Sequence, residues 1–104
     1  MVQGHKIDLR LSHRIDVGEA AKGLLGPLDC DGWHVACQHE HLLVIQFSKG
    51  DTHEYAVRFE CSAPVEKGIF HGSRAWSLSI IPLRDNAILP AKMEEIKLVL
   101  EQLE

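Results

Sequence analysis

The stretch WHVACQHEHLLVIQFSKGDTHEYAVRFEC, residues 33–61, has the clearest pattern in the sequence, because its apolar side chains fall on odd-numbered positions. These positions are Trp33, Val35, Cys37, Leu43, Ile45, Phe47, Tyr55, Val57, Phe59 and Cys61. Successive side chains of a strand point to opposite faces of a sheet. The alternation therefore predicts three consecutive antiparallel strands with one buried face.

The same alternation predicts the register of these strands. Residues that pair across a hairpin share a face, which requires an odd number of residues in each loop. We therefore expect loops at 39–41 and 49–51, the second with Gly50 in the left-handed region. The expected cross-strand pairs are Cys37 with Leu43, Trp33 with Phe47, Phe47 with His53, Ile45 with Tyr55 and Leu43 with Val57. In this register His53 forms part of the half-buried wall of the sheet.

Upstream of this stretch, the sequence predicts one strand and one helix. Ile7, Leu9 and Leu11 alternate with polar residues and indicate the first strand. Asp16 can cap a helix over residues 17–25, whose apolar residues follow helical spacing. Two glycines inside this helix each weaken it by about 1 kcal/mol relative to alanine, so we expect packing to stabilise it.

Downstream, the sequence predicts a further strand and a final helix. Trp76, Leu78 and Ile80 alternate with small residues and indicate a strand with Trp76 on its buried side. Pro90 suits the first turn of a helix, and Leu98 lies outside the apolar stripe of that helix. The stripe comprises Leu89, Met93, Ile96, Leu100 and Leu103.

The expected element order is strand, helix, four strands, helix, with no repeat and no linker. This order predicts a single α+β domain over residues 1–104, in which an antiparallel sheet of about five strands packs two helices on one face. At 104 residues the chain can bury a core without a metal or a disulfide.

The composition excludes several classes of partner and location. A net charge of -4 and a pI near 5.9 argue against binding to nucleic acid or to an anionic membrane. We find no secretory signal and no apolar run long enough to span a bilayer, so we expect a cytoplasmic protein. Three irregularly spaced cysteines fit reduced thiols better than a disulfide framework.

Seven histidines make metal binding the first chemistry to consider. The expected register brings Cys37, His39, His41 and Cys61 toward one end of the sheet. Zinc accepts imidazole and thiolate ligands in tetrahedral sets. However, the spacing is not that of two close ligand pairs, and both cysteines fall in the apolar phase, where a free cysteine behaves as a small hydrophobe. The alternative is two solvated loop histidines beside two buried thiols.

The segment KGIFHGSR, residues 67–74, is a second candidate site. Backbone N–H groups of a glycine-containing turn, together with a guanidinium and a hydroxyl, can hold a small anion. The candidate ligand-binding residues are Lys67, Phe70, His71, Ser73 and Arg74. The segment matches neither the phosphate-binding loop nor the dinucleotide fingerprint. The alternatives are a solvated surface connection with Phe70 under the sheet edge, which the surface position of most loops favours, and an extension of the following strand with a bulge.

No motif in the sequence predicts a reaction, a catalytic residue or a cofactor. Cys37 and Cys61 fall in the core phase, and the carboxylates on either side of an exposed Cys30 disfavour its thiolate. We therefore expect a non-catalytic protein-interaction or regulatory binding module. It would contact a protein partner, or a second copy in a homodimer, through a sheet edge, the connection after Cys61 or the last helix. The alternative is a metal- or small-anion-binding module at one of the two candidate sites.

Overall fold

The computed structural model describes residues 6–65, 72–84 and 88–103. The elements in chain order are β1 (Ile7–Asp16), α1 (Val17–Leu24), β2 (Gly32–His39), β3 (Leu42–Lys49), β4 (Thr52–Cys61), β5 (Arg74–Pro82), α2 (Ile88–Ala91) and α3 (Met93–Glu101). The strands form one antiparallel sheet in the order β1-β5-β4-β3-β2. The predicted α+β class is confirmed, and the strand order makes β1 and β2 the two edges of the sheet.

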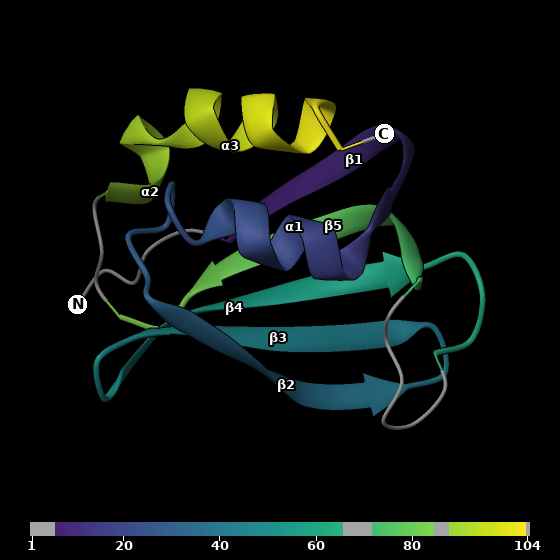
Figure 1. Ribbon diagram of the computed structural model, residues 1–104, viewed down its shortest axis with the longest axis horizontal. Coiled ribbons are helices and arrows are strands. Elements are labelled where there is room, and N and C mark those ends of the chain that lie inside the picture. The colour runs from purple at the N-terminus through teal and green to yellow at the C-terminus, as the bar shows by residue number, and fades with distance from the viewer. Residues whose placement is uncertain (1–5, 66–71, 85–87, 104) are drawn as a thin grey trace.

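Helices α1 and α3 lie on the same face of the sheet (Figure 1). Asp16 caps α1 as predicted, since its carboxylate accepts a hydrogen bond from the Glu19 N–H at 3.1 Å. The inward side chains of the helices and the sheet form one core. Its largest fully buried members are Tyr55, Phe47, Phe59, Ile15, Leu24, Leu28, Leu43, Ile45, Leu78, Ile80 and Ile96. The fold therefore has two layers, with one covered and one open sheet face.

The two helices approach each other closely at Gly23. A Cβ atom at this position would lie 2.6 Å from Cγ1 of Val99. The glycine that weakens α1 as an isolated helix thus allows α1 to pack against α3. The predicted final helix is divided into α2 and α3 by Lys92, which has φ -101° and ψ 4°. Leu98 is 55% exposed, as its position outside the apolar stripe predicts.

The predicted register of β3 and β4 is wrong because the turn between them is shorter. The loop consists of Gly50-Asp51 alone, with Gly50 at φ 61°. A bulge in β4 at Glu54 then returns the apolar side chains to the core face, so that Phe47 pairs with Tyr55. His53 precedes this bulge and is exposed instead of forming the predicted wall.

The end of the β2–β3 hairpin also departs from the predicted register. Its loop is Glu40-His41, with Glu40 in the left-handed region at φ 53°. A bulge at Ala36 shifts β2, so Cys37 pairs with Val44 rather than with Leu43. Cys37 is consequently exposed, and its predicted place in the core is wrong.

Trp76 lies outside the core, which also contradicts the prediction. β5 has a bulge at Trp76, which lies between Ser77 and the fully buried Ala75. The side chain of Trp76 is 37% exposed. β1 loses its register at the same place, over residues 11–14. Bulges of this kind re-aim a side chain, and here they turn the indole away from the helices.

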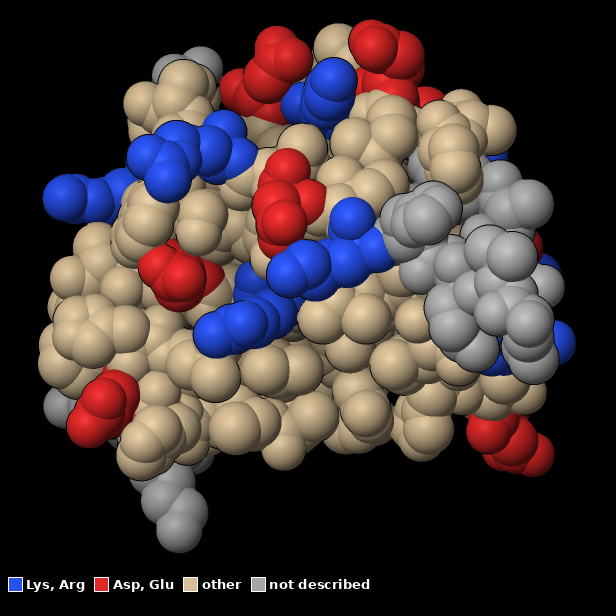
Figure 2. Space-filling view, turned by 180° about the vertical axis from the view of Figure 1, so that it is seen from behind, with Lys and Arg blue, Asp and Glu red and all other residues tan. Residues whose placement is uncertain are grey.

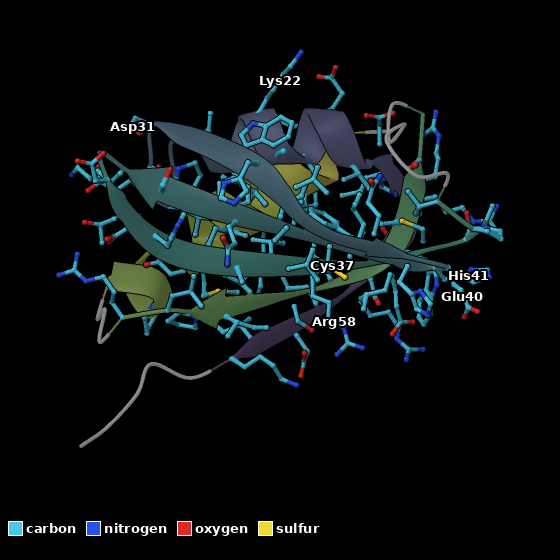
Figure 3. All side chains as sticks on the ribbon, turned by 90° about the horizontal axis from the view of Figure 1, so that it is seen from below. Lys22, Asp31, Cys37, Glu40, His41 and Arg58 are labelled. Carbon is cyan, nitrogen blue, oxygen red and sulfur yellow. The ribbon has the colours of Figure 1, made fainter. Side chains whose placement is uncertain are left out.

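The open face of the sheet lies opposite the helices (Figure 3). Exposed side chains on this face include Arg58 and Glu60 of β4 and Cys37 of β2. Over residues 6–65, 72–84 and 88–103, no helix combines the length and the apolar character that crossing a bilayer requires.

Candidate functional site

Among the described strands, β2 pairs with β3 alone and so forms an edge of the sheet. Its eight residues, GWHVACQH, include no Lys, Arg, Asp, Glu or Pro. It forms the lower margin of the molecule in Figure 1, with His34, Ala36, Cys37 and His39 exposed. An edge strand presents unpaired backbone groups to other chains, and proteins usually block it with charges, proline or bulges. Within its own residues β2 has the bulge at Ala36 but no charge and no proline, a composition that suits pairing with a further strand.

The turn before β2 is fixed to the β3–β4 hairpin. Lys49 Nζ donates a hydrogen bond to Asp29 Oδ2 at 2.8 Å, and the Gly50 N–H donates one to Asp31 Oδ2 at 2.9 Å. The hydrogen bond and the opposite charge lower the pKa of Asp29 and raise the pKa of Lys49. Asp29 has φ 55°, a left-handed conformation that Asp adopts more readily than most residues. These contacts set where the β2 edge begins.

The open face beside β2 carries charges of both signs. The register places Asp8 and Arg10 of β1 on the same face as Arg58 and Glu60 of β4. Figure 2 shows Lys and Arg side chains across the middle of the back of the molecule, with Asp or Glu side chains beside them. Asp8 also accepts a hydrogen bond from the hydroxyl of Ser79. Mixed charge gives this face no preference for anions or cations as a class.

The structure does not bring the four predicted metal ligands together. Cys61 is buried, whereas Cys37 and His39 are exposed on the open face. Nδ1 of His41 lies 3.0 Å from the carbonyl oxygen of Cys61, so its ring contacts the backbone rather than the thiol. Figure 3 shows Glu40 and His41 at the hairpin end, away from Cys37. Across the described ranges, no three or more His, Cys, Asp or Glu side chains are grouped to hold a metal ion.

The second predicted site falls largely outside the described residues. Lys67, Phe70 and His71 belong to the range 66–71, which the structure does not describe. Ser73 and Arg74 are described at the start of β5. The carbonyl of Ser73 accepts a hydrogen bond from the Val17 N–H at 2.9 Å, and the side chain of Arg74 is exposed. Anion binding by this segment stays a prediction.

Two of the three cysteines have thiols of raised pKa. Burial, followed by neighbouring carboxylates of which Glu54 acts most strongly, raises the pKa of Cys30 to about 11. Cys30 is half-buried rather than exposed as expected, but the predicted effect of its carboxylate neighbours is confirmed. Burial also raises the pKa of Cys61. Since the thiolate is the nucleophile, both are poor candidates for covalent catalysis.

Two side-chain pairs on the open face were not predicted from the sequence. The guanidinium of Arg10 lies over the ring of Trp76, 5.4 Å from its centroid. The rings of His34 and His53 have centroids 5.4 Å apart and planes inclined by 59°. Each pair depends on a bulge, at Trp76 or at Glu54, and neither bulge contains a glycine or proline that would mark it in the sequence.

A concavity lies between β1 and α3. It has a volume of about 280 Å³, at the lower limit of pockets that hold small molecules. It is lined by Leu9, Arg10, Leu11, Ser12, His13, Ile15, Lys97, Leu100 and Glu101. Nε2 of His13 is buried and makes no hydrogen bond within the described part of the chain. The cavity lies at the far edge of the sheet from β2.

Comparison with known proteins finds no family model that matches the sequence, no matching curated protein and no matching solved structure. No role is therefore transferred from a relative, and the function rests on the geometry of the chain itself.

Proposed function

We propose that this protein is a non-catalytic protein-binding module that receives an extended strand of another chain along β2. The observation that carries the proposal is an exposed eight-residue edge strand without a charged residue or a proline. An added strand would pair with β2 through main-chain hydrogen bonds, and every second side chain of the added strand would extend the open face of the sheet. It would meet no helix there, since α1 and α3 cover the opposite face (Figure 1).

A second copy of the chain is one possible partner, because its β2 strand can pair with the β2 strand of the first copy. Two β2 strands brought together antiparallel form a self-complementary contact, which is the arrangement of most dimers with two-fold symmetry. Neither strand brings a fixed like charge to this contact, because β2 has no Lys, Arg, Asp or Glu. The same contact through β1 would bring the charged side chains of that strand, Asp8, Arg10, Arg14 and Asp16, to the seam between the two copies.

The state of the thiols supports binding rather than thiol catalysis. The pKa of Cys30 is raised to about 11, and burial raises that of Cys61. At neutral pH both are protonated and weakly nucleophilic.

The test uses a peptide with the sequence of β2 as the added strand. The peptide covers residues 32–39 with serine in place of Cys37, so that it cannot form a disulfide with the protein. We expect saturable binding to the tag-free protein by fluorescence anisotropy. Ala36→Lys puts a charge on the edge at an exposed position, and we expect it to weaken binding about tenfold or more.

The matched control places the same charge on the other edge. Ser12→Lys is also exposed, lies in β1 and should leave the affinity for the peptide unchanged. Sedimentation at rising protein concentration tests the second copy as partner, and Ala36→Lys should abolish any dimer it detects. A protein that stays monomeric and does not bind the peptide at millimolar concentration would refute the proposal. Equal losses in the two lysine variants would refute it as well.

A further inference from the structure

His34 and His53 meet on the open face although different strands carry them. His34 pairs with Gln46 and His53 with Ser48, so both rings lie beside β3, one from each neighbouring strand. Their centroids are 5.4 Å apart. Both side chains are exposed, and within the described part of the chain neither ring has a further hydrogen bond or ion pair.

The bulge at Glu54 creates this pair. Without it, the alternation of β4 would put His53 on the covered face with Tyr55. The carboxylate of Glu54 is itself engaged by Arg84 at 2.8 Å. The two imidazoles therefore stand together without a carboxylate partner and open to solvent.

The distance between the two rings suits two ligands of one metal ion. A zinc–nitrogen bond is about 2.0–2.1 Å, and a ring nitrogen lies about 1.1 Å from the ring centre, so two imidazoles on a tetrahedral ion have centres about 5.2 Å apart. The observed centroid distance is 5.4 Å, with the planes inclined by 59°.

We propose that His34 and His53 bind a divalent late transition-metal ion, with water in the remaining coordination positions. Imidazole suits Zn²⁺, Ni²⁺ and Cu²⁺, and affinity for nitrogen ligands generally follows Zn²⁺ < Cu²⁺. No third His, Cys, Asp or Glu of residues 6–65, 72–84 and 88–103 joins the pair. The ion is therefore solvent-exposed and exchangeable, unlike an ion in a closed four-ligand structural site. This site shares no residue with the set predicted from the sequence.

Zinc alone is the probe, because copper would oxidise the exposed thiol of Cys37. Calorimetric titration of the tag-free protein with Zn²⁺ should give one site per chain. His34→Gln and His53→Gln should each weaken binding roughly tenfold or more, since loss of even an outer-shell partner costs about 10–100-fold in metal affinity. The double variant, which keeps neither imidazole, should bind zinc more weakly than either single variant.

Two variants with other metal-binding side chains on the same face provide the controls. His39→Gln and Cys37→Ser remove exposed potential ligands of β2 and should leave the zinc affinity unchanged. Side-chain NMR at one equivalent of zinc should shift the resonances of His34 and His53 before those of the other histidines. The proposal is overturned if zinc does not bind at millimolar concentration, or if either control weakens binding as much as His53→Gln. A uniform response of all histidines overturns it too, because it would show adventitious binding only.

Discussion

The two edges of the sheet differ in almost every feature that governs pairing with another chain. β1 carries charged side chains including Asp8, Arg10 and Arg14, and it leaves the sheet register over residues 11–14. α3 also runs beside it, because both elements line the same cavity. β2 has no charged residue, only the bulge at Ala36, and no helix at its margin in Figure 1. These features disfavour addition of a strand at β1 and favour it at β2.

This difference follows from the order of strands in space rather than from their order in the chain. β1 comes first in the sequence but lies beside β5, which leaves β2 at the opposite edge. The covering helices follow β1, since α1 begins at Val17, directly after β1 ends, and α3 packs against α1. The fold thus places α3 beside the β1 edge of the sheet and no described helix beside the β2 edge (Figure 1).

The largest expected loss in the free energy of unfolding comes from truncating a core side chain of β1. Ile15 of β1 is fully buried and pairs with Ala75. We expect Ile15→Ala to lower the free energy of unfolding by about 3 kcal/mol, within the range for truncating a buried isoleucine. Val35 of β2 is only partly buried, and Val35→Ala should lower it by about 1 kcal/mol. Urea unfolding with unchanged m-values would measure both.

The losses in unfolding free energy of Ile15→Ala and Val35→Ala, compared with each other, show whether β1 and β2 differ in their contribution to the core. Leu43→Ala in the neighbouring β3 is a control for truncation at a central strand and should cost as much as Ile15→Ala, because Leu43 is also fully buried. If Val35→Ala destabilises the protein as much as Ile15→Ala, β2 is integrated into the core like β1, and the contrast between the edges is wrong.

A smaller effect is expected where the helices α1 and α3 meet. Gly23→Ala raises the helix propensity of α1 by about 1 kcal/mol, but the added Cβ would lie 2.6 Å from Cγ1 of Val99. Valine is stiff at χ1, so the helices must separate, and overpacking of this kind costs about 1–3 kcal/mol. We expect a net loss of about 1 kcal/mol in the free energy of unfolding. Hydrogen exchange should rise at residues 7–10 of β1 but not at β2.

Combining Gly23→Ala with Val99→Ala separates the clash between the two helices from the gain in helix propensity of α1. In a Val99→Ala background the clash is absent, so Gly23→Ala should stabilise the protein instead of destabilising it. If Gly23→Ala destabilises both backgrounds equally, the close approach of α1 and α3 does not explain the glycine.

The sequence predicts the element types well, because alternation and helical spacing are local signals. It also predicts the register where no bulge intervenes, as in the pairing of Trp33 with Phe47. It fails after Ala36, before Tyr55 and at Trp76, where bulges occur at residues with no special backbone preference. A bulge is chosen by how the finished strands twist and pack, so no single strand records it.

The candidate surface was predictable only in part for a related reason. Each strand shows which side chains share a face, but nothing in β2 shows that it lies at an edge, since that depends on β1 pairing with β5. The pairing of His34 with His53 needed both the strand order and the bulge at Glu54. Long-range pairing therefore decides the functional surface, while local pattern decides the elements.

The smallest expected effect concerns the ion pair that fixes the start of the β2 edge. The pKa of Asp29 is lowered by its hydrogen bond to Lys49, so the carboxylate stabilises the fold above its ordinary pKa near 3.8 and stops doing so as the pH falls through the lowered value. Asp29→Asn removes the charge and keeps a side chain that tolerates the left-handed backbone. The variant should be slightly less stable at pH 7, and the difference should vanish in acid.

Thermal unfolding from pH 7 down to about pH 2, below the titration range of an ordinary Asp, would follow this difference. Both partners are exposed, so the loss should be small and should shrink further in high salt. Asp51→Asn is the control in the same hairpin, because the described residues show no ion pair at Asp51. A difference between wild type and Asp29→Asn that persists unchanged in acid would mean that the side-chain amide, rather than the lost charge, disturbs the turn. The charge of Asp29 would then not position the β2 edge, and the hydrogen bond from the Gly50 N–H to the Asp31 carboxylate would remain as the attachment of the turn.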